Sequence, residues 1–218
     1  YDRYLREEFQ ALPKDGYTPM FERMVAACGD KLEIRLNTDY RDLPESTTFS
    51  HLVYTGPIDA FYDFTFGELP YRSLRFENES FTPEALKDRE AISKKRGFWQ
   101  PAMQVNYPND QPFTRIVEIK HATGQTCPNT TIVREYPDDY GPGKEPYYPI
   151  PAPDATGLYQ KYKALAEANV IPDSLKRIAH NFPISFIGRL ATYRYYNMDQ
   201  VVGMALSEFE KIAKSLQS

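Results

Sequence analysis

A short apolar run, a glycine turn and the start of a helical pattern follow one another in Ile184-Ser-Phe-Ile-Gly-Arg-Leu-Ala-Thr-Tyr-Arg-Tyr-Tyr-Asn-Met-Asp-Gln200. The first four residues suit a buried strand, and residues 201–216 place apolar side chains at helical spacing. A helix N-terminus offers free backbone N–H groups, and the arginines and tyrosines of the turn add further donors. The stretch therefore predicts a strand–turn–helix unit that binds a phosphate or diphosphate, with a stacked, solvated arginine–tyrosine surface as the alternative.

Composition excludes several classes of protein. The chain has 218 residues, of which 41% are apolar, and this is enough for a sizeable core in one or two domains. Its formal net charge of -4 argues against a nucleic-acid partner, because binding a phosphate backbone normally requires a basic excess. No apolar run approaches the roughly 20 residues that span a bilayer, and no signal-peptide pattern opens the chain. We therefore expect no membrane contact and a cytoplasmic location.

Metal and hydrolase chemistry have no signature in this sequence. Cys28 and Cys127 lack a C-x-x-C or other ligand spacing, and His51, His121 and His180 lie far apart. The nucleophile motif Gly-x-Ser-x-Gly does not occur. We expect two buried or idle thiols, no metal site and no Ser–His–Asp hydrolase.

The order of elements predicts an α+β fold. A helix opens at Thr18-Pro19, and strands are expected at residues 32–36 and 51–55. Short alternating runs at residues 74–76, 102–106, 115–119 and 132–135 then favour an antiparallel sheet, interrupted by a charged insert at residues 83–96. A long ordered loop at residues 138–153 and a helix at 158–168 precede the strand–turn–helix unit. We predict an antiparallel-sheet domain, residues 1–14 and 68–149, inserted into a partial α/β domain, residues 15–67 and 150–218.

Five motifs together resemble the UDP-galactopyranose mutase family. They are Tyr54-Thr-Gly-Pro-Ile-Asp59, Tyr71-Arg-Ser-Leu-Arg-Phe76, Phe113-Thr-Arg-Ile116, Glu145-Pro-Tyr-Tyr-Pro149 and residues 188–200. The motifs have the family's order and similar spacings, and the resemblance covers essentially the whole chain. It implies that the α/β part, residues 15–67 and 150–218, belongs to an FAD-binding domain. It also implies UDP-galactose or a related UDP-sugar as ligand, and it allows a homodimer.

One feature of that family is absent from this sequence. The family holds the diphosphate of its flavin with a strand, a Gly-x-Gly-x-x-Gly turn and a helix. The glycines here occur singly or in Gly141-Pro-Gly143. We therefore expect a C-terminal portion of such an enzyme, inactive by itself. A UDP-sugar-binding fragment without flavin is the alternative, and a flavoprotein of amine-oxidase-like fold is a third interpretation that leaves the Tyr-Tyr-Pro and Gly-Arg-Leu motifs unexplained.

The resemblance also implies a reaction and a set of residues. The family interconverts UDP-galactopyranose and UDP-galactofuranose on reduced FAD through a flavin–sugar adduct, so the cofactor carries the difficult step. The protein must stabilise the departing diphosphate and hold the sugar. By resemblance, Arg189 and Arg115 are catalytic. Substrate contacts are implied for Arg189, Arg115, Tyr148, Tyr195, Asn106 and Phe9, and flavin contacts for Gly188, Arg189, Asn197, Met198, Asp199, Gln200 and Val201.

Three residues depart from the family pattern. Phe9 and Phe113 stand where members often have tyrosine, so two hydroxyl groups are missing. Asn197 stands where many members have aspartate, which removes a negative charge near the flavin. Each departure is expected to alter ligand affinity or flavin potential without contradicting the family.

Overall fold

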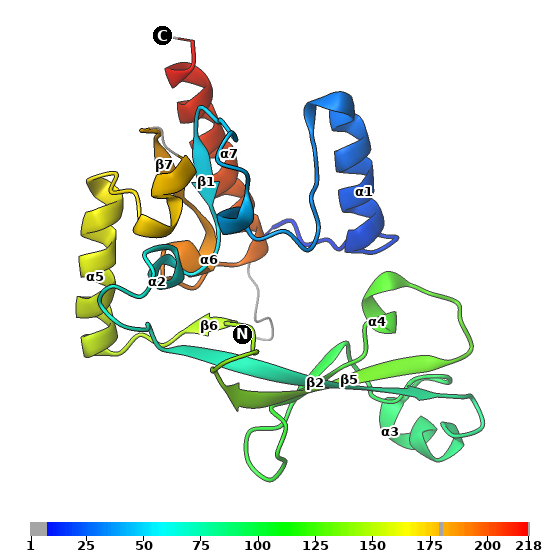
Figure 1. Ribbon diagram of the computed structural model, residues 1–218. Helices are drawn as coiled ribbons and strands as arrows, with labels where there is room; N and C mark the ends of the chain where they lie inside the picture. Colours follow the sequence, from blue (N-terminus) through cyan, green and yellow to red (C-terminus); the bar gives the residue numbers. More distant parts are fainter. Residues whose placement is uncertain (1–7, 179–180, 218) are drawn as a thin grey trace. The chain divides into compact units, whose positions relative to one another are not determined.

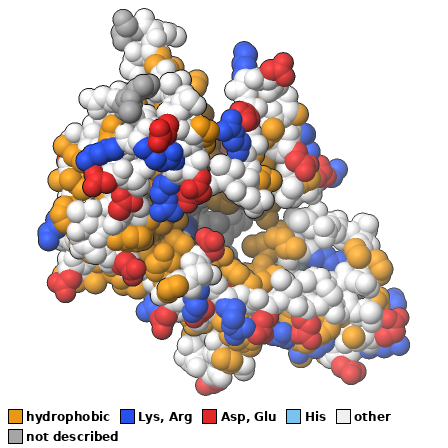
Figure 2. All heavy atoms as spheres, in the orientation of Figure 1, with side chains coloured by type: hydrophobic (Ala, Val, Ile, Leu, Met, Phe, Trp, Pro, Cys, Tyr) orange, Lys and Arg blue, Asp and Glu red, His pale blue; other side chains and the backbone are white. Residues whose placement is uncertain are grey.

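The computed structural model describes residues 8–178 and 181–217 (Figure 1). The chain divides into two compact units. One comprises Arg75–Pro137 and the described part of Tyr1–Arg35, and the other comprises Leu36–Leu74 and the described part of Asp138–Ser218. They are called the sheet unit and the helix-rich unit below. Figure 2 shows Lys and Arg side chains interspersed with Asp and Glu over the visible face.

The helix-rich unit is built on a two-stranded parallel sheet. Strand β1 (Leu52–Tyr54) pairs with β7 (Ile184–Phe186) in the register Leu52↔Ile184. The helices of this unit are η2 (Tyr40–Asp42), α2 (Ile58–Phe61), α5 (Pro153–Glu167), η4 (Asp173–Ile178), α6 (Gly188–Ala191) and α7 (Met198–Ser215). The strand–turn–helix prediction is thus confirmed, with the short helix α6 added in the turn.

Aromatic rings form the core of this unit. Phe61 is fully buried, and its ring centroid lies 4.7 Å from that of Tyr54 and 5.0 Å from that of Phe186. The hydroxyl of buried Tyr162 donates to Gly67 O at 2.7 Å and accepts from Phe66 N at 3.0 Å. The rings therefore supply apolar burial, while a tyrosine hydroxyl satisfies the backbone groups of the neighbouring turn.

Helix α7 is anchored through polar side chains on one of its faces. Ser185 on β7 donates to Glu208 Oε1 at 2.6 Å, and the Ser185 hydroxyl lies 2.8 Å from His51 Nε2. The hydrogen bond from Ser185 and the contact with Lys211 lower the pKa of Glu208. In this series of contacts, the serine lies between the histidine and the glutamate. A catalytic triad has histidine in the middle, so these three residues do not form one, and they serve to anchor the helix.

A five-stranded sheet of order β3-β4-β5-β2-β6 forms the second architectural element. Its strands are β2 (Tyr71–Phe81), β3 (Gln104–Asn106), β4 (Arg115–Val117), β5 (Thr130–Asp139) and β6 (Tyr148–Pro149). The pairs β3–β4, β4–β5 and β2–β6 are antiparallel, which confirms the predicted antiparallel sheet. The helices of the sheet unit are α1 (Tyr17–Cys28), η1 (Gly29–Lys31), η3 (Lys87–Arg89), α3 (Glu90–Ser93) and α4 (Lys120–Thr123), whereas strand β6 belongs to the helix-rich unit.

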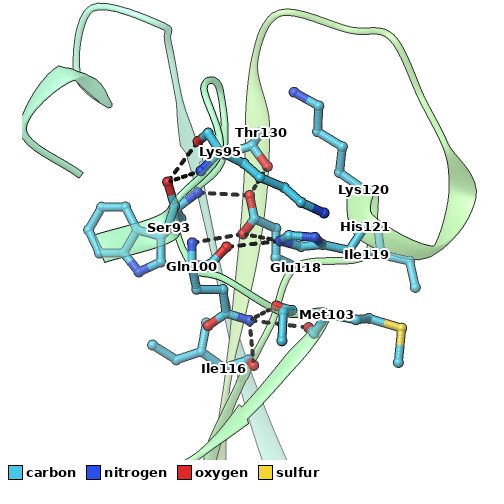
Figure 3. Close-up of polar contacts among 12 residues, drawn as sticks. Ser93, Lys95, Gln100, Met103, Ile116, Glu118, Ile119, Lys120, His121 and Thr130 are labelled. Carbon is cyan, nitrogen blue, oxygen red and sulfur yellow. Dashed lines mark hydrogen bonds and ion pairs between the residues drawn. The ribbon is translucent and has the colours of Figure 1, made fainter. Parts of the chain in front are cut away.

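A buried carboxylate joins the loops at one end of this sheet (Figure 3). Glu118 is fully buried and accepts hydrogen bonds from Trp99 N, Gln100 N and the Thr130 hydroxyl. His121 Nε2 lies 3.4 Å from Glu118 Oε2. The carboxylate therefore has partners from three separate segments, as a buried charge requires.

Three sequence predictions need correction. Residues 32–36 form no strand, and Leu32, Ile34 and Leu36 are exposed, because no neighbouring strand pairs with this alternating segment in the described part of the chain. Helix α1 begins at Tyr17 with Gly16, rather than Thr18, at its cap. Cys28 and Cys127 were expected to be buried or idle: both are free, which fits idle thiols, but they are exposed and not buried.

The predicted domain boundaries and the unit boundaries differ. The compact units divide the chain at residues 35, 74 and 137, whereas the sequence predicts boundaries at residues 14, 67 and 149. The loop at residues 138–153 contributes the short strand β6 to the sheet. Within the described ranges, no helix combines the length and apolarity needed to cross a membrane.

Buried Asp59 gives a pH-dependent prediction. Its side chain is 1% exposed and accepts a hydrogen bond from Leu69 N at 2.8 Å, and burial raises its pKa. The carboxyl group of Asp59 therefore binds a proton more tightly in the folded protein than in the unfolded chain. As the pH rises from the unfolded pKa of about 3.9 through the higher folded pKa, the free energy of unfolding falls. Asp59→Asn should therefore flatten this decline, measured by urea unfolding across the acidic to neutral range.

The amide of Asp59→Asn keeps an oxygen for Leu69 N and removes the buried charge. At neutral pH the free energy of unfolding should be unchanged or raised. Asp63→Asn makes the same substitution at an exposed neighbouring position and serves as the control for the exchange of a carboxylate for an amide. A steeper decline in Asp59→Asn would contradict the argument.

Candidate functional site

Arg189 on α6 is held by two backbone carbonyl groups. Its Nη1 donates to Tyr147 O at 3.1 Å, and its Nη2 donates to Tyr196 O at 2.7 Å. The acceptors belong to different segments, one next to β6 and the other just before α7. These bonds fix the plane and direction of the guanidinium.

Two tyrosine rings flank this guanidinium. Arg189 Cζ lies 4.5 Å from the ring centroid of Tyr195 and 5.2 Å from that of Tyr148. The two rings are stacked, with centroids 6.1 Å apart and an interplanar angle of 21°. Tyr195 is 58% exposed, so its phenol is open to a ligand in solution. The structure thus brings together three of the expected substrate-binding residues.

The charge of Arg189 is available to an anion. Within residues 8–178 and 181–217, Arg189 forms no ion pair. Its two backbone acceptors are neutral, and the ring faces of Tyr148 and Tyr195 favour a cation without cancelling its charge. A guanidinium beside phenols is well suited to a diphosphate.

Tyr193 connects the segments that carry these residues. Its hydroxyl lies 2.7 Å from Pro70 O and 2.9 Å from Ile150 O, and its backbone has φ +46°. Ile150 directly follows β6, which carries Tyr148, whereas Tyr193 lies between Arg189 and Tyr195 in the chain. From the sequence, Tyr193 is only one of several tyrosines in the turn, with no predicted role of its own. A left-handed conformation at a non-glycine residue has no clear sequence signal.

Tyr193→Phe should loosen this connection. Loss of the hydroxyl is expected to lower the free energy of unfolding by about 1 kcal/mol and to weaken the binding of UDP that the family resemblance implies. Urea unfolding and calorimetric titration with UDP measure the two effects. Tyr159→Phe is the matched control, because the Tyr159 ring stacks on Tyr193 at 5.6 Å while its hydroxyl makes no hydrogen bond within the described chain. Equal losses in both variants would contradict this role of the Tyr193 hydroxyl.

The start of α7 holds the residues expected to contact flavin. Asn197 and Gln200 form a capping box, in which Gln200 Oε1 accepts from Asn197 N at 2.9 Å. Met198 and Asp199 are exposed in the first turn, and Val201 is half-buried. Gly188, at the start of α6, has φ +89°, which explains why glycine is favoured there. Asn197, which departs from the family pattern, is therefore an effective helix cap.

The remaining expected residues lie in the sheet unit. Asn106 on β3 is directly opposite Arg115 on β4, and Arg115 is in turn opposite Glu135 on β5. Arg115 Nε lies 3.2 Å from Glu135 Oε1. Phe9 is 86% exposed. The structure therefore places the expected substrate residues in two groups, one in each unit, and Arg115 already has an acidic partner.

A cavity of about 830 Å³ in the sheet unit is a feature that the sequence analysis missed. Its lining includes Lys87, Arg96, Phe98, Lys120 and Cys127, from two separate segments. None of the expected site residues lines it. The sequence offers no signal for this cavity, because no motif links the two segments.

Comparison with known proteins identifies a family and several proteins to which this chain is similar. Residues 1–195 match the family model of UDP-galactopyranose mutase. A probable UDP-galactopyranose mutase of Klebsiella pneumoniae is 33% identical over 218 residues, covering 99% of this chain and 49% of the relative. A dTDP-fucopyranose mutase of Escherichia coli is 30% identical over 212 residues, covering 94% of this chain and 49% of the relative.

Two further matches, one of sequence and one of structure, were found. A UDP-galactopyranose mutase of Mycoplasma pneumoniae is 33% identical over 217 residues, covering 93% of this chain and 48% of the relative. A crystal structure of reduced UDP-galactopyranose mutase aligns with a TM-score of 0.43 and 16% identity, covering 68% of this chain and 37% of the other. The chain spans about half the length of the curated relatives that it matches.

Proposed function

Because the chain belongs to the UDP-galactopyranose mutase family, we propose that it supplies the diphosphate-binding part of a flavin-dependent isomerase that interconverts UDP-galactopyranose and UDP-galactofuranose. The observation that carries this proposal is Arg189, a guanidinium fixed by two carbonyl groups and flanked by Tyr148 and Tyr195. Its chemistry suits the diphosphate that all nucleoside-diphosphate sugars share.

Arg189 acts most strongly while the sugar–phosphate bond breaks. Negative charge grows on the diphosphate as the bond to the anomeric carbon lengthens, so a fixed guanidinium stabilises the transition state more than the ground state. The phenols of Tyr148 and Tyr195 donate hydrogen bonds to the same group. Because the backbone carbonyl groups of Tyr147 and Tyr196 hold Arg189, little reorganisation is needed during the reaction.

The start of α7 is the proposed contact for FAD. Reduced flavin, when bound, supplies the nucleophilic chemistry at the sugar. The residues that would hold it are Gly188, Arg189 and residues 197–201. Arg189 and the positive end of the α7 dipole fit an anionic group, whereas the Asp199 carboxylate in the first turn opposes one and would have to point away from it. In this proposal residues 15–67 and 150–218 form part of the flavin domain, while residues 1–14 and 68–149 form the sheet domain that carries Asn106, Arg115 and Phe9.

A UDP-sugar-binding module without flavin or activity is the second candidate. It is favoured by the absence of Gly-x-Gly-x-x-Gly from the 218 residues. Both candidates use the same diphosphate contacts, so UDP binding does not separate them.

Turnover separates the two candidates. The protein is incubated with reduced FAD and UDP-galactofuranose, and UDP-galactopyranose is quantified by chromatography, with dTDP-fucopyranose as an alternative sugar nucleotide. The assay is run on the chain alone and on the chain combined with the unmatched half of the Klebsiella pneumoniae relative. Turnover in either sample supports the mutase, whereas UDP binding without turnover in both supports the binding module.

A further inference from the structure

The cavity of about 830 Å³ has no part in the proposed function. One wall comes from within residues 83–98 and the other from within residues 120–128, so every lining residue belongs to the sheet unit. Small-molecule sites in proteins commonly have volumes of about 300–1,000 Å³. The cavity is therefore large enough for a small organic ligand, and its lining indicates which chemical class would fit.

Lys120 is the deepest cation of the lining. It is 8% exposed, and its Nζ donates to Gly97 O at 3.0 Å and to Asn129 O at 3.1 Å. Both acceptors are neutral, and Lys120 forms no ion pair in the described part of the chain. Figure 3 shows its side chain extending away from the Glu118 carboxylate. An ammonium has three N–H groups, so one remains for a ligand, and an anion would compensate the buried charge.

Two further cations, Arg96 and Lys87, line the same cavity and are exposed. Neither has an ion-pair partner among the residues that the structure describes. Glu84 and Glu90 also line the cavity, and three cations with two carboxylates leave a net charge of +1. A guanidinium and an ammonium on one wall suit a single phosphate group, because the guanidinium fork binds two of its oxygens. The two carboxylates disfavour a second anionic group and accept hydrogen bonds from hydroxyl groups.

The uncharged part of the lining suits a carbon skeleton that carries hydroxyl groups. Phe98 and Pro128 add apolar surface. Gln125 and Thr126 add side chains that both donate and accept hydrogen bonds. A phosphate ion alone would leave most of these groups without contact, so the lining favours an organic phosphate.

We propose that this cavity is a second binding site, and that its ligand is a phosphomonoester of a polyhydroxylated molecule, of the sugar phosphate class. In this site the phosphate contacts Lys120 and Arg96, and the hydroxyl groups contact Glu84 and Glu90. The residues proposed to bind UDP-galactose or flavin do not line the cavity. The inference is therefore independent of the proposed function, and its test requires no turnover.

Calorimetric titration with three probes tests the ligand class. Glucose 6-phosphate is expected to bind most tightly, inorganic phosphate more weakly and glucose not detectably. Arg96→Gln should weaken binding of glucose 6-phosphate about tenfold, which is the effect of losing one charged hydrogen bond. Lys94→Gln removes a charge two positions away, outside the lining, and should bind as wild type. Arg189→Ala should also bind glucose 6-phosphate as wild type, because Arg189 belongs to the other unit.

Cys127 reports directly on occupancy of the cavity. It lines the cavity, and its thiol is free and exposed. Bound glucose 6-phosphate should slow alkylation of Cys127 by iodoacetamide, measured by mass spectrometry of its peptide. Cys28, an exposed free thiol at the end of α1, does not line the cavity and should react at an unchanged rate.

Four outcomes would overturn the inference. They are no saturable binding of glucose 6-phosphate, equal affinity for glucose 6-phosphate and inorganic phosphate, unchanged binding by Arg96→Gln, and no selective protection of Cys127. Circular dichroism and urea midpoints confirm that the variants are folded. Mutase turnover without binding of glucose 6-phosphate would refute this site alone, whereas binding without turnover would leave it in place, so the two failures are distinguishable.

Discussion

Arg189→Ala is expected to lower turnover of UDP-galactofuranose at least a hundredfold, in whichever form the protein is active, because one fixed donor to a developing charge is typically worth that much. Its effect should fall on kcat more than on KM, since the charge on the diphosphate is largest in the transition state. Steady-state kinetics with reduced FAD measures the two parameters. Normal turnover by this variant would show that Arg189 has no catalytic role.

Two further variants separate charge from geometry. Arg189→Lys keeps the positive charge, but an ammonium lacks the planar fork that reaches both Tyr147 O and Tyr196 O, so intermediate turnover is expected. Arg194→Ala removes a neighbouring exposed guanidinium that stacks on Tyr196 and should leave turnover near wild type. Equal losses in Arg189→Ala and Arg194→Ala would point to a general effect of local charge.

The second large effect concerns flavin. The 218-residue chain by itself is expected to bind neither reduced nor oxidised FAD saturably at micromolar concentration, and to show no turnover. Its residues 188–201 offer one wall of a flavin site, while the glycine-rich turn that commonly holds a dinucleotide diphosphate is not in the sequence. A ligand held on one side loses most of its contacts but still incurs the entropy cost of immobilisation.

Flavin fluorescence titration followed by the turnover assay checks this expectation. Addition of the unmatched half of the Klebsiella pneumoniae relative is the positive control and should restore binding. Stoichiometric flavin binding by the chain alone would show that it builds a flavin site without the glycine-rich turn.

Local patterns in the sequence predicted much of the fold. The run at residues 184–187 and the helical spacing after residue 200 correctly predicted β7 and α7. This was possible because apolar residues recur along the sequence with a different spacing in a strand and in a helix. Residues 32–36 show where this fails: alternation describes a strand only when another strand lies beside it, and pairing partners are not encoded locally.

The candidate site was predictable in its residues but not in its geometry. The motifs identified Arg189, Tyr148 and Tyr195, and the structure brings them together, while their catalytic roles stay predictions. The carbonyl groups that hold Arg189 and the link through Tyr193 could not be read from the sequence. Most of these contacts join segments far apart in the sequence: Arg189 lies 42 positions after Tyr147, and Tyr193 lies 123 positions after Pro70.

Buried Glu118 affects how the loops of the sheet unit unfold. Its carboxylate draws its partners from Trp99–Gln100 and Thr130 at once, and removing any one leaves part of a buried anion uncompensated. Intermediate openings of these loops are therefore costly, whereas opening all of them together lets water solvate the charge. The loops around Glu118 should exchange their amide hydrogens as one cooperative unit, with a common opening free energy instead of a gradient of independent fraying.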